Sequence, residues 1–148
     1  MAMVFDSRAT RRSPRWLWGL LVLVLILTAA YAALRLAGSP EAATVPAEIS
    51  VQQAAEKRQT GAFILDVRQP DEWNAFHIPD AALIPLDQLQ ARIAEVPQNT
   101  EIIVVCRTGS RSAQGRDLLR AAGYPTVTSM AGGMTEWRAA GLPTMSGP

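Results

Sequence analysis

The chain has 148 residues, 14 of them basic and 13 acidic, for a formal net charge of +1. It has one cysteine, Cys106, which excludes an intramolecular disulfide. Residues 1–40 hold five arginines and one aspartate, a net charge of +4, whereas residues 41–148 hold nine basic and twelve acidic residues, a net charge of −3. The arginines of the second part alternate with acids and form no basic run, so we expect no nucleic-acid partner.

The first expected element is an apolar helix near the N-terminus. From Trp16 to Leu34, nineteen residues carry no charge, close to the length that crosses a bilayer. Four arginines precede this stretch and only Arg35 follows it closely, a bias that keeps the N-terminus in the cytoplasm. We therefore expect residues 1–15 to be a basic cytoplasmic segment and residues 16–37 a single transmembrane helix in the lipid bilayer of the inner membrane. The rest would then lie on the periplasmic side.

A cleaved signal peptide is the alternative interpretation of the same segment. The small residues around Tyr31 offer a cleavage site after a basic start and an apolar stretch. Cleavage would release the protein into the periplasm. The apolar run continues to Leu34, longer than a usual signal core, which favours a retained anchor.

Residues 38–47 read as a short linker, and residues 48–148 as one domain in which helices and strands alternate. Ser50 and Gln53 predict a capping box for a helix over 51–59. Strands are expected at 62–67, 81–84, 102–105 and 125–128; the other helices at 70–73, from Asp87 to Val96, from the cysteine loop to Ala122, and from Gly133 to Gly141. Such alternation predicts an α/β domain with a central parallel sheet covered on both faces, which binds ligands beyond the carboxyl ends of its strands.

The residues Cys106-Arg107-Thr108-Gly109-Ser110-Arg111 stand between an apolar strand and a helix. Loop N–H groups and the positive end of the helix dipole converge at such a place, where they stabilise a thiolate and bind anions. A lone cysteine after an apolar strand can also be a small hydrophobic filler. A filler, however, requires neither the glycine nor the two arginines. We therefore expect Cys106 to be a nucleophile for an anionic substrate.

Five stretches, taken in order, resemble the single-domain rhodaneses, a family of sulfurtransferases. They are Leu65-Asp66-Val67-Arg68; His77-Ile78-Pro79 with Ala81 and Ile84-Pro85-Leu86; Cys106 to Ser112; Ala121-Ala122-Gly123-Tyr124; and Ala131-Gly132-Gly133-Met134 with Trp137 and Gly141-Leu142-Pro143. The resemblance covers about residues 48–143 and implies a rhodanese-like, doubly wound domain.

The resemblance also implies an activity. Cys106 would take sulfane sulfur from thiosulfate or a persulfide donor, form a persulfide, and pass the sulfur to a thiol or to cyanide. The substrate-binding residues would be Arg107, Thr108, Gly109, Ser110 and Arg111. Asp66, Arg68 and His77 would support the loop, with Asp66 or Glu72 bracing Arg111. No metal or organic cofactor is required for this chemistry.

Some details separate this chain from its relatives. Four residues lie between Cys106 and Arg111, whereas family members with phosphatase activity have one more, so the loop favours sulfur over phosphate. Phe76 and Asp80 stand where the family usually has glycine. Two other functions are kept open: a non-catalytic binding module tethered to the membrane, and a redox sensor that works through oxidation of Cys106.

Overall fold

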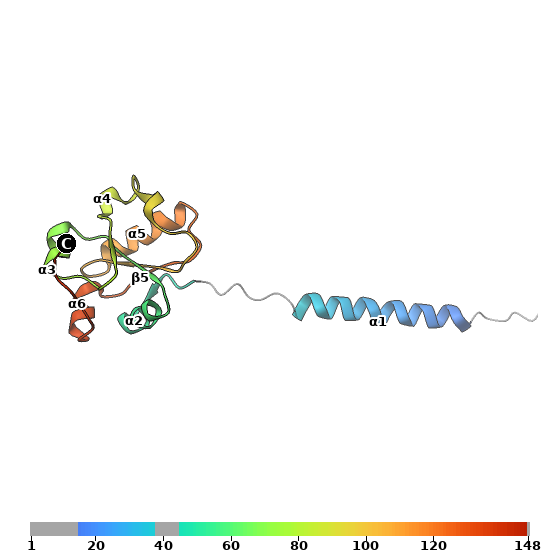
Figure 1. Ribbon diagram of the computed structural model, residues 1–148. Coiled ribbons are helices and arrows are strands. Elements are labelled where there is room, and N and C mark those ends of the chain that lie inside the picture. Colours follow the sequence, from blue (N-terminus) through green and yellow to red (C-terminus); the bar gives the residue numbers. More distant parts are fainter. Residues whose placement is uncertain (1–14, 38–44, 148) are drawn as a thin grey trace, which may run out of the picture. The chain divides into compact units, whose positions relative to one another are not determined.

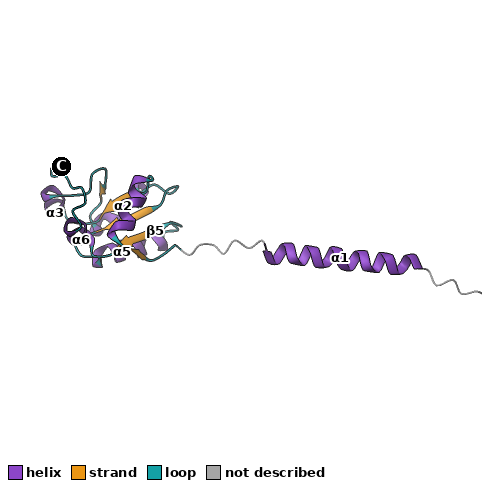
Figure 2. Ribbon diagram, turned by 90° about the horizontal axis from the view of Figure 1, so that it is seen from below, coloured by secondary structure: helices purple, strands orange, loops and turns teal. Residues whose placement is uncertain are grey.

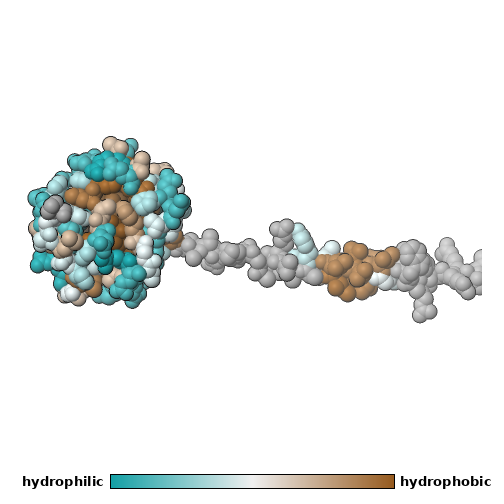
Figure 3. Space-filling view, viewed as in Figure 1, coloured by the Kyte–Doolittle hydropathy of each residue, from teal (hydrophilic) through white to brown (hydrophobic). Residues whose placement is uncertain are grey.

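The computed structural model describes residues 15–37 and 45–147, which belong to two separate units, Met1–Ala43 and Thr44–Pro148. The first unit contains helix α1 (Arg15–Ala37), whose side chains are described for residues 18–29 and for Tyr31. These side chains are exposed and mostly apolar (Figure 3).

The expected membrane span is not supported by these residues. Within the part of the chain that the structure describes, no helix combines the length and the apolar character needed to cross a membrane. The expected cytoplasmic segment, except Arg15, and positions 38–44 of the expected linker lie outside the described residues.

The second unit is built on one five-stranded sheet (Figure 1). The strand order is β1-β5-β4-β2-β3 and every neighbouring pair is parallel, as the alternation of elements predicts. The strands are β1 (Glu48–Ile49), β2 (Phe63–Asp66), β3 (Ala82–Leu83), β4 (Ile102–Val105) and β5 (Val127–Met130). The helices are α2 (Val51–Gln59), α3 (Pro70–Ala75), α4 (Leu86–Leu89), the 3-10 turn η1 (Ile93–Glu95), α5 (Ser110–Ala121) and α6 (Gly133–Ala139).

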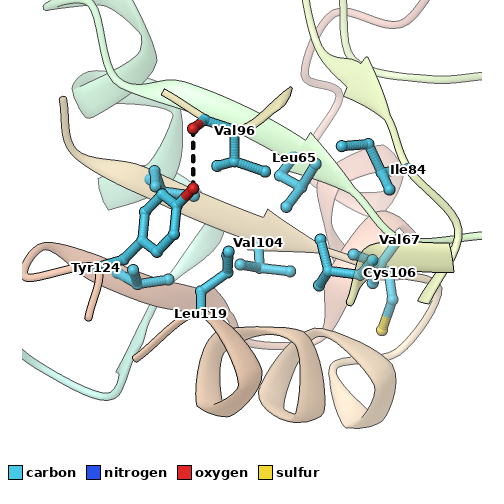
Figure 4. Packing of buried hydrophobic residues seen from close by; sticks show 11 residues of the cluster. Leu65, Val67, Ile84, Val96, Val104, Cys106, Leu119 and Tyr124 are labelled. Carbon is cyan, nitrogen blue, oxygen red and sulfur yellow. Dashed lines mark hydrogen bonds between the residues drawn. The ribbon is translucent and has the colours of Figure 1, made fainter. Parts of the chain in front are cut away.

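Helices cover both faces of the sheet (Figure 2), and the side chains of the central strand β4 require this because they are apolar on both faces. Ile102 and Val104 point into one apolar cluster, together with residues of α4 and α5, and Cys106 continues this alternation (Figure 4). Ile103 and Val105 point into a second cluster with residues of α2 and α6. All four strand residues are buried, which accounts for the uninterrupted apolar run.

The helix expected from Asp87 to Val96 is in fact two short pieces, α4 and η1. Residues 90–92 form a turn between the two pieces, and η1 ends just before Pro97, which has no N–H with which a helix could continue. The hydroxyl of Tyr124 lies 2.7 Å from the carbonyl of Ile93 and 3.1 Å from the carbonyl of Val96 (Figure 4).

Of the other elements predicted from the sequence, one is confirmed, one is displaced and one was missed. The capping box of Ser50 and Gln53 is confirmed, with both hydrogen bonds present. Strand β5 begins two residues later than expected, and the two-residue edge strand β1 was missed altogether. Asp80 adopts the left-handed backbone that glycine would favour, with φ of 62°, and its carboxylate binds Arg58 at 2.9 Å.

Candidate functional site: the cysteine loop

The cysteine loop begins where β4 ends and runs into the N-terminus of α5. Gly109 is the N-cap of α5 and has φ of 107°, a conformation that side chains rarely adopt. In this conformation its amide donates to the sulfur of Cys106 at 3.1 Å. The cysteine is buried, with 1% of its surface exposed.

Ser112, one turn into α5, is the second group beside the sulfur. Its Oγ lies 3.6 Å from Sγ of Cys106 and donates to the carbonyl of Gly109 at 2.7 Å. A neutral thiol donates to this hydroxyl, but a thiolate can only accept. The Ser112 hydroxyl can therefore stabilise the thiolate only if it turns its hydrogen from the carbonyl to the sulfur.

These contacts decide the acidity of the thiol. Burial raises the pKa of the Cys106 thiol. The hydrogen bonds from the Ser112 hydroxyl and from three loop amides outweigh burial, so the pKa lies below its ordinary value. The amides are those of Thr108, Gly109 and Ser112. The site thus stabilises a thiolate, the nucleophilic form of cysteine.

The carbonyl side of the loop is held by the start of α6. The amide of Met134 donates to the carbonyl of Cys106 at 2.8 Å, and the amide and hydroxyl of Thr135 donate to that of Arg107 at 3.0 and 2.9 Å. Gly133 makes this approach possible, because a Cβ at this position would lie 2.4 Å from the Cys106 carbonyl oxygen. The start of α6 thus fixes the first two residues of the loop.

Arg111 is braced by Glu72, which resolves the alternative that the sequence left open. Its guanidinium donates two hydrogen bonds to the carboxylate, at 2.7 and 2.8 Å. The Arg111 hydrogen bond holds the pKa of Glu72 below its ordinary value, although partial burial opposes this. Since Glu72 lies on α3 and Arg111 on α5, the ion pair ties the loop to a separate element.

Asp66 contacts Arg68 rather than the cysteine loop. The two side chains form a fully buried ion pair, with Nη2 and Oδ2 2.6 Å apart. The same guanidinium also donates to the carbonyl of Glu72, within α3, and to that of Phe76, the C-cap of this helix. The pair therefore positions the helix that carries Glu72, and its support of the loop is indirect.

His77 is buried and likewise stabilises the end of α3. Its ring stacks on Trp73 with 3.7 Å between ring centroids, and Nδ1 lies 3.1 Å from the Trp73 carbonyl. Its backbone pairs with Met145 near the C-terminus. These contacts join α3 to the C-terminal segment, which is a structural role.

A cavity of about 460 Å³ opens beside the loop, between α3 and α6. The residues that line it are Arg68, Asp71, Glu72, Ala75, Phe76, Arg107, Met134, Thr135 and Arg138. Arg107, Thr108 and Ser110 are exposed. Ser112, Thr135 and Arg138 were not expected as site residues: Ser112 lies at the end of the cysteine motif but was given no role, and no local pattern marks Thr135 or Arg138.

The described residues contain no group of three or more His, Cys, Asp or Glu side chains placed to hold a metal ion. What the site does offer is a buried thiol whose ionised form is stabilised by amides and a hydroxyl. The fold and the loop thus define a class: parallel α/β domains with a cysteine of lowered pKa at the end of a central strand.

Comparisons with known proteins identify the family within this class. Residues 50–140 match the rhodanese-like domain, and the chain belongs to this family. A sulfurtransferase of Allochromatium vinosum is 34% identical over 84 residues, which are 57% of this chain and 78% of that protein. The thiosulfate sulfurtransferase GlpE of Tolumonas auensis is 34% identical over 91 residues, 61% of this chain and 86% of that protein.

Solved structures agree with this assignment. A rhodanese-related protein from Thermoplasma volcanium aligns with a TM-score of 0.64 at 25% identity, over 68% of this chain and 98% of that one. Other curated relatives are longer: this chain spans 54% of a putative sulfur carrier protein of Bacillus subtilis, and about half of an HTH-type transcriptional regulator of Mycobacterium tuberculosis and of a protein of Synechocystis. The rhodanese-like domain therefore occurs both in short sulfurtransferases and as one part of larger proteins.

Proposed function

We propose that the protein is a sulfurtransferase that moves sulfane sulfur from thiosulfate or a persulfide donor to a thiol or to cyanide through a Cys106 persulfide. The observation that carries the proposal is the environment of the sulfur. A hydroxyl and the loop amides surround Sγ and lower the pKa of the thiol. The sulfurtransferases among the relatives support the same chemistry.

With thiosulfate as donor, the Cys106 thiolate attacks the outer sulfur of the donor. A bond forms between Sγ and that sulfur, the bond within thiosulfate breaks, and sulfite leaves with its electron pair. The persulfide anion then occupies the place of the thiolate, where the same N–H groups stabilise its charge. Attack by a thiolate or by cyanide on the outer sulfur returns Cys106 to its starting form.

Mass spectrometry of the intact protein tests this proposal. After incubation with thiosulfate we expect a gain of one sulfur atom, which cyanide removes and which is absent in Cys106→Ser. A folded protein with a titratable thiol that gains no sulfur from thiosulfate or a persulfide would contradict the proposal. The outcome would then favour the binding or redox-sensing module.

We further propose that residues 16–37 anchor the protein in the inner membrane with the domain on the periplasmic side. The support is the uncharged stretch from Trp16 to Leu34 and the arginines before it. Extraction of bacterial membranes with alkaline carbonate should leave the full chain in the pellet. Release of the intact chain into the supernatant would overturn the anchor, and a shortened chain in the periplasm would indicate signal cleavage.

A further inference from the structure

The cavity beside the loop is larger and more varied in chemistry than a small sulfur donor needs. At about 460 Å³ it falls within the size range of ligand pockets, about 300–1,000 Å³. Thiosulfate is a compact dianion. It would leave the apolar wall formed by Ala75 and Phe76 uncovered, and the carboxylate of Asp71 would repel it.

The charged groups of the cavity fall into two sets. Arg68 and Glu72 are already bound, to Asp66 and Arg111 respectively. Among the residues that the structure describes, Asp71, Arg107 and Arg138 form no salt bridge. The wall of the cavity therefore presents two cations and one anion that no charged side chain neutralises.

Phe76 fixes one of these cations. The guanidinium of Arg138 lies over the Phe76 ring, 4.3 Å from its centroid, so its planar face is covered and its N–H edge is left for a ligand. Phe76 thus provides both part of the apolar wall and the platform for Arg138.

We propose that this cavity binds the sulfur acceptor and selects a zwitterionic, peptide-like thiol, with a carboxylate on Arg138 and an ammonium group near Asp71. The proposal rests on the sulfurtransferase function and names its acceptor. Planar guanidinium groups bind carboxylates through two parallel hydrogen bonds. Phe76 contributes the apolar surface for the carbon skeleton.

The transfer step then needs no further reactant. The acceptor thiolate attacks the outer sulfur of the Cys106 persulfide, and a bond forms between these two sulfur atoms. The bond between Sγ and the outer sulfur breaks and its electron pair stays on Sγ. The products are the acceptor persulfide and the Cys106 thiolate.

Kinetics of the full-length protein, loaded with sulfur from thiosulfate, test the selectivity. Glutathione and its diethyl ester share the same thiol, but only glutathione has free carboxylates. We expect kcat/KM to favour glutathione at least tenfold, through KM. Arg138→Gln should abolish most of this preference, Arg138→Lys should retain part of it, and Phe76→Ala should weaken it. Arg92→Gln, at a surface arginine outside the cavity, is the matched control and should leave it unchanged.

A binding experiment separates this inference from the proposed function. In the full-length Cys106→Ser protein, which cannot transfer sulfur, S-methylglutathione is titrated by calorimetry. We expect binding that weakens about tenfold when Arg138→Gln is added. Absence of binding, or equal binding with and without Arg138→Gln, overturns the acceptor site even if the wild type forms a persulfide. A wild type that transfers sulfur equally to glutathione and its ester overturns it as well.

Discussion

At the scale of single residues, the acidity of Cys106 depends on a balance between burial and a few hydrogen bonds. The loop amides are fixed by the backbone and cannot be removed without changing the loop. The Ser112 hydroxyl is the one side chain in this balance, and it must rotate to serve the thiolate. It is therefore the contact that a substitution can remove most cleanly.

Ser112→Ala should raise the pKa of the Cys106 thiol, because the lost hydrogen bond favours the ionised form. The rate of alkylation by iodoacetamide should fall several-fold at pH 7, and its pH profile should move to higher pH. Ser110→Ala is the control, since Ser110 is exposed and its hydroxyl has no contact with the sulfur. An unchanged profile in Ser112→Ala would show that the amides alone set the acidity.

At the scale of elements, the site depends on how closely α6 approaches the cysteine loop. Gly133→Ala should cost more than about 3 kcal/mol in the free energy of unfolding, because its Cβ would meet backbone atoms of Cys106 and Arg107. Gly141→Ala is the matched control: it has a similar φ, 69° against 57°, but no atom within 4 Å of a Cβ. It should lose only about 1–2 kcal/mol through backbone strain. Urea unfolding measures both, and equal losses would contradict the role of close approach.

The ion pair between α3 and α5 makes a second prediction at this scale. Glu72→Gln leaves Arg111 partly buried without a carboxylate, and should lower the free energy of unfolding by about 1–2 kcal/mol at pH 7. Urea unfolding across a range of pH measures this loss. The exposed pair of Glu95 with Arg92 provides the control, because Glu95→Gln should leave the urea midpoint unchanged.

The pH dependence of this loss follows from the lowered pKa of Glu72. A carboxyl group whose pKa is lower in the folded than in the unfolded state stabilises the fold above its ordinary pKa. This stabilisation disappears as the pH falls through the lowered value. The difference between the wild type and Glu72→Gln should therefore narrow on acidification. A constant difference down to pH 2 would assign the loss to packing rather than to charge.

The sequence predicts those elements whose signals are local. The apolar run of β4, the glycine of the loop and the capping box of α2 each lie within a few residues of what they determine. The partner of Arg111 could not be chosen from the sequence. Glu72 is 39 positions away, and Asp66, at the end of β2, offers a carboxylate as well. The break between α4 and η1, at residues 90–92, was missed because neither glycine nor proline stands there.

At the scale of the whole molecule, the parts that the sequence missed are held by contacts between distant segments. Strand β1 has only two residues and lies at the edge of the sheet, beside β5. Ser129 of β5 is polar but buried, and its Oγ lies 3.1 Å from the carbonyl of Ala47, 82 positions away. A pattern of apolar residues contains no sign of such a pair, which explains why β1 was missed.

The same contacts extend the domain beyond its expected start at residue 48. The carbonyl of Ala47 accepts from the amide of Ser129 and from Arg116 of α5, both at 3.0 Å. Arg120 donates to the carbonyls of Val45 and Pro46 at 3.2 and 3.0 Å. Residues 45–47, assigned to the linker on sequence grounds, are thus bound along β5 and α5. The chain therefore enters the domain at the end of the sheet opposite to Cys106, because β1 is parallel to β4.

We expect the fragment 44–148 to fold on its own, and the fragment 48–148 to be less stable by about 1–3 kcal/mol, since its arginines lose three backbone acceptors. Urea unfolding of the two fragments measures the difference. Arg120→Gln supplies the control. If the hydrogen bonds of Arg120 to Val45 and Pro46 are the cause, this substitution should cost more in the longer fragment than in the shorter one, because truncation and substitution remove the same hydrogen bonds. Equal costs of Arg120→Gln in both fragments would assign the difference to the contacts of Ala47 with Ser129 of β5 instead. Equal midpoints of the two parent fragments would return residues 45–47 to the linker.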